Sequence, residues 1–405
     1  MNGHESWFDN DINYSRKGTG VFHPNLGHLE KEDKECNPIS LDSVLPDVLQ
    51  EKILASLPIA CVVKACCVCK KWNGMVHSKK FVLDDADVLS HNPWYFMFTG
   101  SDEPVGFAYD SILQKWYGFE FPLIIKDTWI ATPSCGLVSF MDEESSSELH
   151  VCNPITRDYK KLEAPLDPIF SVYSALAFSV DRESNDYTLA VVRSRQPSDD
   201  FQQWEASIHV YYSQTMIWVP PVVGNLEGWR AGNVSVICDG IVYFLVYSTR
   251  VGDIRTSHGM LSYNLNNPPS SGELMDTFIS APCALTCGRL MNLNNELVMV
   301  GGVGRQDRPG IIRGIRVWVL KGRDWEEVSR MPPRFFQGFG ELDEVFAGSG
   351  AGDLIYIQSY GATVLAVFNI KSNQWTWSQK CPMSKRSALQ LFSGFCFEPR
   401  LGVSP

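Results

Sequence analysis

Apolar residues recur at helical spacing in the stretch Leu41–Val76. Residues that stand four positions apart lie on one face of a helix. Such a stripe is formed here by Leu45, Leu49, Ile53 and Leu57. Pro46 suits the first position of this helix, where its missing N–H is not needed, and Pro58 ends it. The pattern predicts an amphipathic helix at the start of a short helical domain.

A second helical run follows Pro58. Its apolar face consists of Val68, Trp72, Met75 and Val76, and it carries positive charge at Lys64, Lys70 and Lys71. Two or three helices of this length form a unit of about 40 residues, which is close to the lower limit for a domain that folds alone. The apolar stripe therefore needs a cover. Spacing leaves two covers open: the following domain, or another protein.

From Pro93 onward, the apolar residues form short runs rich in Val, Ile, Phe, Tyr and Trp, separated by turn residues. This pattern is typical of an all-β structure. A repeat underlies it, in which one aromatic precedes another by seven positions across a polar turn: Tyr109 and Trp116, Tyr211 and Trp218, Trp318 and Trp325, Phe368 and Trp375. The repeating unit of roughly 45–55 residues predicts a β-propeller with four-stranded blades, of which about six fit.

The predicted domains follow from these patterns. Residues 1–38 are polar and are expected to form a disordered tail. Residues 39–90 form the helical domain and a linker, and residues 91–400 form the propeller. Its first blade, near residues 94–122, is too short, whereas Leu389–Glu398 is a spare strand. We expect this strand to pair into the first blade and close the ring, which removes exposed sheet edges.

The composition of the chain limits the classes of partner that it is expected to bind. The chain has 405 residues, a net charge of −11 and a pI near 5.3, so charge does not favour a nucleic-acid partner. The longest uninterrupted apolar run, Ile241–Tyr247, is far shorter than the roughly 20 residues of a membrane-spanning helix, and the N-terminus lacks the pattern of a signal peptide. We expect neither nucleic acid nor a membrane as partner. The twelve cysteines are expected to be buried thiols.

Candidate chemistry is sparse. Glycine clusters occur at Gly301–Gly304 and Gly348–Gly352, but neither fits a phosphate-binding motif, and tight blade turns with positive φ explain them better. Cys66 and Cys69 form a CxxC spacing without a second ligand pair, so we expect no metal site. We expect no cofactor and no catalytic residues. Arginines are common in binding hot spots, and the substrate-binding candidates are Arg305, Arg308 and Arg334.

The helical stretch resembles an F-box. The matching elements are Leu45-Pro46, Leu49, Ile53-Leu54, Leu57-Pro58 and Val68-Cys69-Lys70-Lys71-Trp72. The downstream repeats resemble degenerate Kelch repeats, with a clear double glycine only at Gly301-Gly302. As a whole, the chain is similar to plant F-box/Kelch-repeat proteins, most closely those of the Hawaiian Skirt type, on stretches such as NPWYFMF, GWRAGN, ALTCGRLMN, RFFQGFGELDEVF and LFSGFCFEPRL.

The resemblance implies a non-catalytic substrate receptor of an SCF-type E3 ubiquitin ligase. Its F-box would bind a Skp-type adaptor, which joins it to a cullin and a RING protein, and its propeller would bind a protein substrate for ubiquitination and proteasomal degradation. Carried over to this sequence, the adaptor-binding residues are Leu45, Pro46, Leu49, Ile53, Leu57, Pro58 and Trp72, with charge complementarity from Lys64, Lys70 and Lys71.

Two alternatives stay open. The propeller could bind a small molecule or glycan, or catalyse a reaction, while the helices serve as an internal cap. The chain could also be a scaffold without ubiquitin transfer. The sequence shows no clear basic import cluster, and the expected location is the nucleus, the cytoplasm or both.

Overall fold

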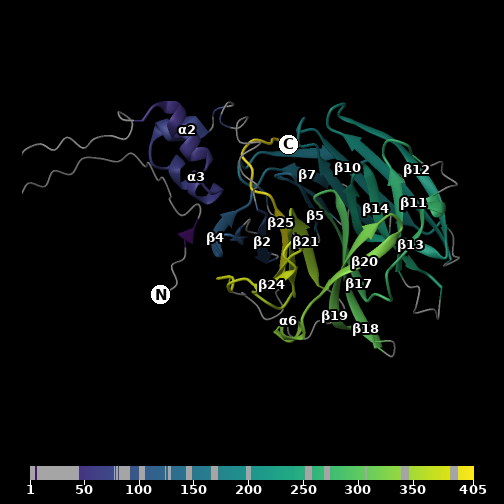
Figure 1. Cartoon of the computed structure of the whole chain (residues 1–405). Helices are drawn as coiled ribbons and strands as arrows, with labels where there is room; N and C mark the ends of the chain where they lie inside the picture. The colour runs from purple at the N-terminus through teal and green to yellow at the C-terminus, as the bar shows by residue number, and fades with distance from the viewer. Residues whose placement is uncertain are drawn as a thin grey trace, which may run out of the picture. The chain divides into compact units, whose positions relative to one another are not determined.

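The computed structural model describes residues 5–6, 45–76, 78, 81, 92–99, 105–123, 125, 129–142, 148–165, 172–197, 202–250, 258–268, 274–305, 308–338, 346–383 and 391–405. The chain divides into two compact units: Trp7–Ser90, and His91–Pro405 together with Met1–Ser6. The first is helical and the second is a β-propeller (Figure 1). Of the predicted disordered tail 1–38, only Glu5–Ser6 belongs to the described residues.

The helical unit consists of α2 (Asp47–Ala55), α3 (Ile59–Cys66) and α4 (Lys70–Val76). Pro46 and Pro58 occupy the N-cap positions of α2 and α3, one residue before the position predicted for Pro46. Their carbonyls accept the first main-chain hydrogen bonds of each helix. The core of this unit comprises Leu54, Ile59, Ala60, Val62, Ala65, Met75 and Val76.

The described part of the propeller folds into six sheets, which are its six blades. The first blade contains β1 (Glu5–Ser6), β2 (Trp94–Thr99), β3 (Val105–Asp110), β4 (Lys115–Glu120) and β25 (Phe392–Phe397). β1 lies parallel to β4, and every other neighbouring pair of strands in this blade is antiparallel. The last strand of the chain, β25, pairs along the whole of β2. This is the pairing expected for Leu389–Glu398, and it completes the short first blade.

The other five blades each follow the chain in order. The second contains β5 (Trp129–Ser134), β6 (Leu137–Asp142), β7 (Glu148–Cys152) and β8 (Tyr159–Glu163). The third contains β9 (Tyr173–Val180), β10 (Tyr187–Arg195), β11 (Gln203–Tyr212) and β12 (Ile217–Glu227). The fourth contains β13 (Trp229–Cys238), β14 (Ile241–Ser248), β15 (His258–Asn264) and β16 (Ile279–Ser280).

The fifth blade contains β17 (Cys287–Leu293), β18 (Glu296–Arg305), β19 (Arg308–Lys321) and β20 (Asp324–Arg330). The sixth contains β21 (Ala347–Ala351), β22 (Leu354–Gln358), β23 (Leu365–Asn369) and β24 (Gln374–Trp377). Two short helical segments, η2 (Leu274–Thr277) and α6 (Pro333–Gly338), lie between strands. No helical period predicted them, because a single turn is too short to show one.

One strand of each blade lines the centre of the ring: β25, β5, β9, β13, β17 and β21. Each of these inner strands contacts the next one, and β21 contacts β25, so the ring is closed. We call the end at which the inner strands begin the upper face, and the end at which they finish the lower face. Tight turns with positive φ follow three inner strands at Cys135-Gly136, Asp239-Gly240 and Asn294-Asn295, as two-residue hairpins require.

The core of the propeller lies between neighbouring blades. Val317 of the fifth blade and Ile355 of the sixth belong to one such cluster, and Ala190 of the third and Phe244 of the fourth belong to another. Between the last and first blades, Tyr95 and Tyr356 are fully buried with ring centroids 5.4 Å apart. Each blade therefore depends on its neighbours for burial of its apolar faces.

The seven-residue aromatic spacing marks the hairpin of the third and fourth strands. Tyr109 pairs with Trp116, and their ring centroids are 5.0 Å apart; Phe368 pairs with Trp375 at 4.6 Å. In the fifth blade, the tight turn between Lys321 and Asp324 places Trp325 opposite Leu320. The fourth blade departs from the series, because its last strand β16 is only two residues long and follows η2.

The prediction that the glycine clusters form turns is wrong for most of their members. Gly301 lies inside β18, and Gly348 and Gly350 lie inside β21. A Cβ on Gly301 would stand 2.7 Å from Leu285 and 2.8 Å from Trp318, so glycine is needed there for close packing between blades. Only Gly352 has the positive φ of a turn.

Candidate functional site

The apolar stripe predicted on the first helix faces outward from the helical unit. Leu49 is 47% exposed and Ile53 is 50% exposed, and neighbouring Val48 is 54% exposed. The opposite side of α2 buries Gln50 and Leu54 against the other helices. Because helices this small cannot bury apolar residues on every side, the exposed residues form a surface suited to a protein partner.

The other predicted adaptor-binding residues, which include Leu45 and Leu57 at the two ends of the stripe, differ in exposure. Pro46 and Pro58 are exposed, whereas Leu45, Leu57 and Trp72 are half-buried. The exposed prolines hold the starts of α2 and α3. The half-buried residues pack partly inside the unit and add less exposed apolar surface than Leu49 and Ile53.

Gln50 is a residue that the sequence did not single out. It is 4% exposed, its side-chain amide donates to the carbonyl of Leu45 at 2.8 Å, and its carbonyl oxygen accepts from the Trp72 indole at 3.2 Å. It thus ties the start of α2 to α4. Its four-residue spacing from Leu54 places it on the buried face, but a polar glutamine side chain gives no apolar signal.

One expectation about the second helical run needs correction. Val68 was expected to share a face with Met75 and Val76, but it lies in the turn between α3 and α4 and is 66% exposed, whereas the other two are buried. Lys71 forms an ion pair with Asp47 at 2.9 Å, and its charge complementarity toward an adaptor stays a prediction. Helical spacing fails at Val68 because the helix is interrupted there.

The cysteines of the CxxC spacing are not uniformly buried. Cys67 is exposed, Cys66 and Cys69 are half-buried, and the sulfur of Cys69 accepts a hydrogen bond from the main chain of Trp72. Among the residues that the structure describes, no three His, Cys, Asp or Glu side chains are grouped to hold a metal ion. Within the same residues, no helix is long and apolar enough to cross a membrane.

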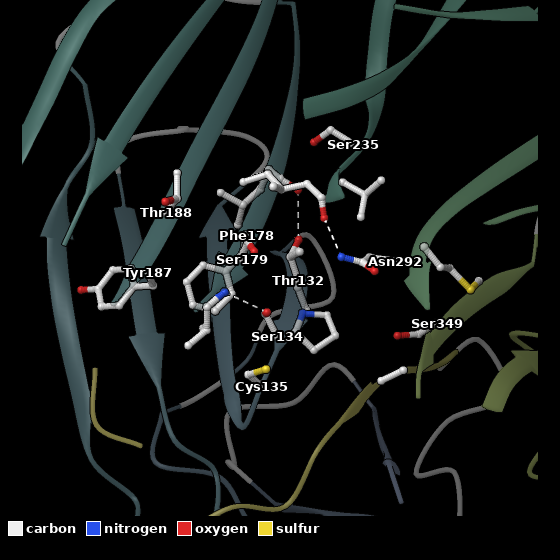
Figure 2. Close-up of a pocket in the computed structure, with 18 of the residues that line it drawn as sticks. Thr132, Ser134, Cys135, Phe178, Ser179, Tyr187, Thr188, Ser235, Asn292 and Ser349 are labelled. Atoms are coloured by element: carbon white, nitrogen blue, oxygen red, sulfur yellow. Dashed lines mark hydrogen bonds between the residues drawn. The ribbon is translucent and has the colours of Figure 1, made fainter. Parts of the chain in front are cut away.

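The propeller contains a central cavity of about 1210 Å³ along its inner strands (Figure 2). Polar side chains on its wall bind the neighbouring inner strand. Thr132 donates to the carbonyl of Leu176 at 3.0 Å, and Asn292 donates to the carbonyl of Ile237 at 3.1 Å. The hydroxyl of Ser134 accepts from the main chain of Val180 at 3.0 Å. These hydrogen bonds stabilise the ring, and they use polar groups that a ligand would otherwise contact.

Charge is unequally distributed along the cavity. Its lower end is lined by five carboxylates: Asp181, Glu183, Asp186, Asp239 and Glu398. Main-chain N–H groups of Ser184 and Glu183 lower the pKa of Asp181, and Arg182 is paired with Glu398 at 3.3 Å. Nearer the upper face the cavity is lined by Arg289. The cavity is therefore acidic at one end and basic at the other.

The three predicted substrate-binding arginines all belong to the fifth blade or to the segment after it. Arg305 ends β18 and Arg308 begins β19, and they lie opposite each other at the upper end of that hairpin. Their side chains lie outside the described residues. Arg334 is exposed on α6, with its guanidinium carbon 5.2 Å from the Phe335 ring centroid. Strand order places all three at the upper face.

Comparison with known proteins gives the family. A model of the F-box domain matches residues 43–84. An F-box/kelch-repeat protein of Arabidopsis thaliana is 49% identical over 390 residues, which cover 93% of this chain and 94% of that protein. Two further Arabidopsis proteins are 24% identical: UNUSUAL FLORAL ORGANS, over 89% of this chain and 85% of its own length, and SKP1-interacting partner 15, over 93% and 100%.

These matches cover the helical unit and the propeller together. The finer assignment to the Hawaiian Skirt type stays a prediction, since the matches identify the family and not that subtype. With nearly half of its residues identical to a relative that it covers almost completely, the chain belongs to the plant F-box/kelch-repeat proteins.

Proposed function

We propose that this protein is the substrate receptor of an SCF-type ubiquitin ligase. Its helical unit docks a Skp-type adaptor, which links it to a cullin and a RING protein. Its propeller binds a protein substrate, which is then ubiquitinated and degraded by the proteasome. The observation that carries the proposal is the exposed apolar stripe of Leu49 and Ile53 on α2, within the stretch that matches an F-box.

Two facts support the adaptor as the cover of this stripe. A relative that this chain matches over 93% of its length bears the name SKP1-interacting partner 15. The stripe also lies on the outer side of α2, while Leu54 on the inner side is 2% exposed and holds the helix in its own unit. The unit can therefore keep its core and still offer an apolar face.

The mechanism is proximity, and it requires no catalytic residue of this chain. A substrate held on the propeller is near a ubiquitin carrier held by the same complex, which raises the effective concentration of its lysines. A closed ring suits this task, because its blades bury their faces against one another and form a rigid platform.

The test is co-expression with a Skp-type adaptor followed by size-exclusion chromatography. We expect a stable one-to-one complex for the wild-type chain and its loss for the double variant Leu49→Ala with Ile53→Ala. The matched control is Ile112→Ala with Leu113→Ala, an exposed apolar pair in the β3–β4 turn of the propeller, which should retain the complex. Equal binding by both double variants would show that α2 does not contact the adaptor.

A receptor and a non-degradative scaffold differ in whether the bound partner is degraded by the proteasome. If the chain is a receptor, the abundance of a captured partner rises when the proteasome is inhibited, and falls again when the inhibitor is removed. If partner abundance ignores the inhibitor, the scaffold is the correct description. The cavity does not favour a small molecule or glycan, because Thr132, Ser134 and Asn292 on its wall already bind neighbouring strands.

We also propose that the protein works in the nucleus, the cytoplasm or both, where SCF complexes would meet their substrates. A fluorescent fusion of the full chain tests this location. Signal confined to the secretory pathway would contradict it.

A further inference from the structure

Two arginines and two tyrosines meet at the upper face of the propeller. The guanidinium carbon of Arg230 lies 4.1 Å from the ring centroid of Tyr173 and 5.0 Å from that of Tyr247. Burial raises the pKa of Tyr247, and Arg289 and Arg230 both oppose this rise, so both positive charges lie near its phenol. The group spans three consecutive blades, through β9, β13, β14 and β17.

The charges of this group are not compensated within the described residues. Arg230 and Arg289 are half-buried, yet no described carboxylate lies within ion-pair distance of either. Elsewhere in the propeller, half-buried arginines do have such partners, as Arg195 has in Glu205. Burial and the nearby Arg230 lower the pKa of His258 to about 4, so this neighbour is neutral at pH 7. Partial burial of unpaired charge is costly, which favours an anionic partner.

The hydrogen-bond donors of both arginines are largely unused. The Arg230 guanidinium lies against two tyrosine rings, but its N–H groups lie in the plane of the group, and none of them donates to a described residue. Arg289 makes one hydrogen bond, to the carbonyl of Gly288 at 3.0 Å. Stacking thus fixes the orientation of Arg230 while its edge stays able to bind a carboxylate with two hydrogen bonds.

The surroundings indicate an extended partner. Arg289 lines the cavity, whose far end carries Asp181 and Asp239, so an acidic chain is attracted to the upper end of the cavity and repelled from its lower end. Exposed Arg334 on α6 adds positive charge to the same face. A single small anion would need only one such site. Several arginines on one face suit a segment with several carboxylates.

We propose that the upper face binds an acidic segment of the protein substrate, and that Arg230 and Arg289 bind its Asp or Glu carboxylates. The inference rests on the proposed function, since it names the class of segment that the receptor recognises. Arg230 and Arg289 are the central contacts, and Arg334 is a peripheral one.

The test is selection of a random twelve-residue peptide library on the full chain in complex with a Skp-type adaptor. We expect the selected peptides to be enriched in Asp and Glu. The strongest of them, labelled with fluorescein, is then titrated with wild type and variants. Arg230→Gln with Arg289→Gln should weaken binding about tenfold or more, as expected for loss of charge-assisted hydrogen bonds. Arg313→Gln is the matched control, because Arg313 is exposed on β19, and it should change the affinity less than twofold.

Arg289→Gln alone leaves the stacking of Arg230 intact and gives a second measure if the double variant is unstable. Selection of neutral or basic peptides only, or of none, would overturn the proposal, and so would equal affinity of an acidic peptide for the double variant. Preference of this face for a fluorescein-labelled oligothymidylate over acidic peptides would also overturn it. Adaptor binding is read separately by co-elution, so failure here is distinguishable from failure of the receptor role.

Discussion

The indole nitrogen of Trp116 in the first blade donates a hydrogen bond of 2.8 Å to the main-chain carbonyl of Gln379, at the end of the last blade. The same link recurs between other neighbours. Trp218 donates to the carbonyl of Glu163, Trp325 to that of Ser280, and Trp375 to the hydroxyl of Ser329. The repeated tryptophan therefore joins its blade to the preceding one, and at Trp116 it joins the two ends of the ring.

Trp116→Phe should destabilise the propeller by about 1–2 kcal/mol, because it removes this hydrogen bond and part of a buried side chain. Equilibrium unfolding in urea measures the change. The control is Tyr159→Phe at the corresponding position of the second blade, where the side chain is 58% exposed, and it should cost almost nothing. Equal stability of both variants would mean that the hydrogen bond from Trp116 to Gln379 does not stabilise the contact between the first and last blades.

Gly301→Ala should destabilise the protein by about 1–3 kcal/mol, the usual cost of overpacking. Its added methyl group would approach Leu285 and Trp318 to within 2.8 Å. Gly314→Ala is the matched control on the neighbouring strand β19, since nothing lies within 4 Å of its added Cβ, and it should be neutral. Thermal unfolding of both variants distinguishes tight packing from a general effect of alanine in this blade.

Asn153→Ala should lower the free energy of unfolding by at least about 2 kcal/mol. This fully buried amide donates to the carbonyls of Arg400 and Val403 at 2.9 and 2.7 Å, and accepts from the main chain of Ile155 at 2.8 Å. Asn369 is its counterpart in the last blade, where it accepts from the main chain of Ser372. Asn369→Ala should cost less than about 1 kcal/mol by chemical denaturation. Similar losses would mean that the segment after β25 adds no stability.

Stability should fall between pH 7 and pH 5, in part through His258. Its pKa in the folded protein is about 4, lowered from 6.5 by burial and by Arg230. Between these two values the unfolded chain binds a proton that the folded protein excludes, so stability is present above pH 6.5 and is lost as the pH falls towards 4. The His258 contribution from pH 7 to pH 5 is about 2 kcal/mol.

His258→Gln removes this proton uptake, so the drop in the urea midpoint should become smaller in the variant. Part of the drop will persist, because burial also lowers the pKa of His150. An unchanged pH profile in the variant would contradict the role of His258.

Much of the fold could be predicted from local pattern. The spacing of Tyr109 and Trp116 marks a hairpin because residues on either side of a short turn must face each other, and the structure pairs them. The spare strand predicted at Leu389–Glu398 needed a partner strand elsewhere in the chain. The hairpin can be predicted from residues that are close in the sequence, and the closing strand from the number of strands in each blade.

The rest depends on contacts between segments that are far apart in the sequence. Gly301 looked like a turn glycine because its neighbours are distant in the sequence: Leu285 precedes β17, and Trp318 lies on β19. Arg230 could not be chosen above other arginines, since Tyr173 and Tyr247 meet it only when two blades pack together. In the helical unit, the buried role of Gln50 depends on Trp72 in another helix.

The pairing of Trp94 with Phe397 also bears on how the protein is made. During synthesis, β2 leaves the ribosome early but stays without its neighbour until β25 has been translated. A chain that lacks β25 therefore has an open ring and an unpaired edge along Tyr95, Phe96 and Met97, which favours aggregation. The ring therefore closes only after β25 has been made, long after β2.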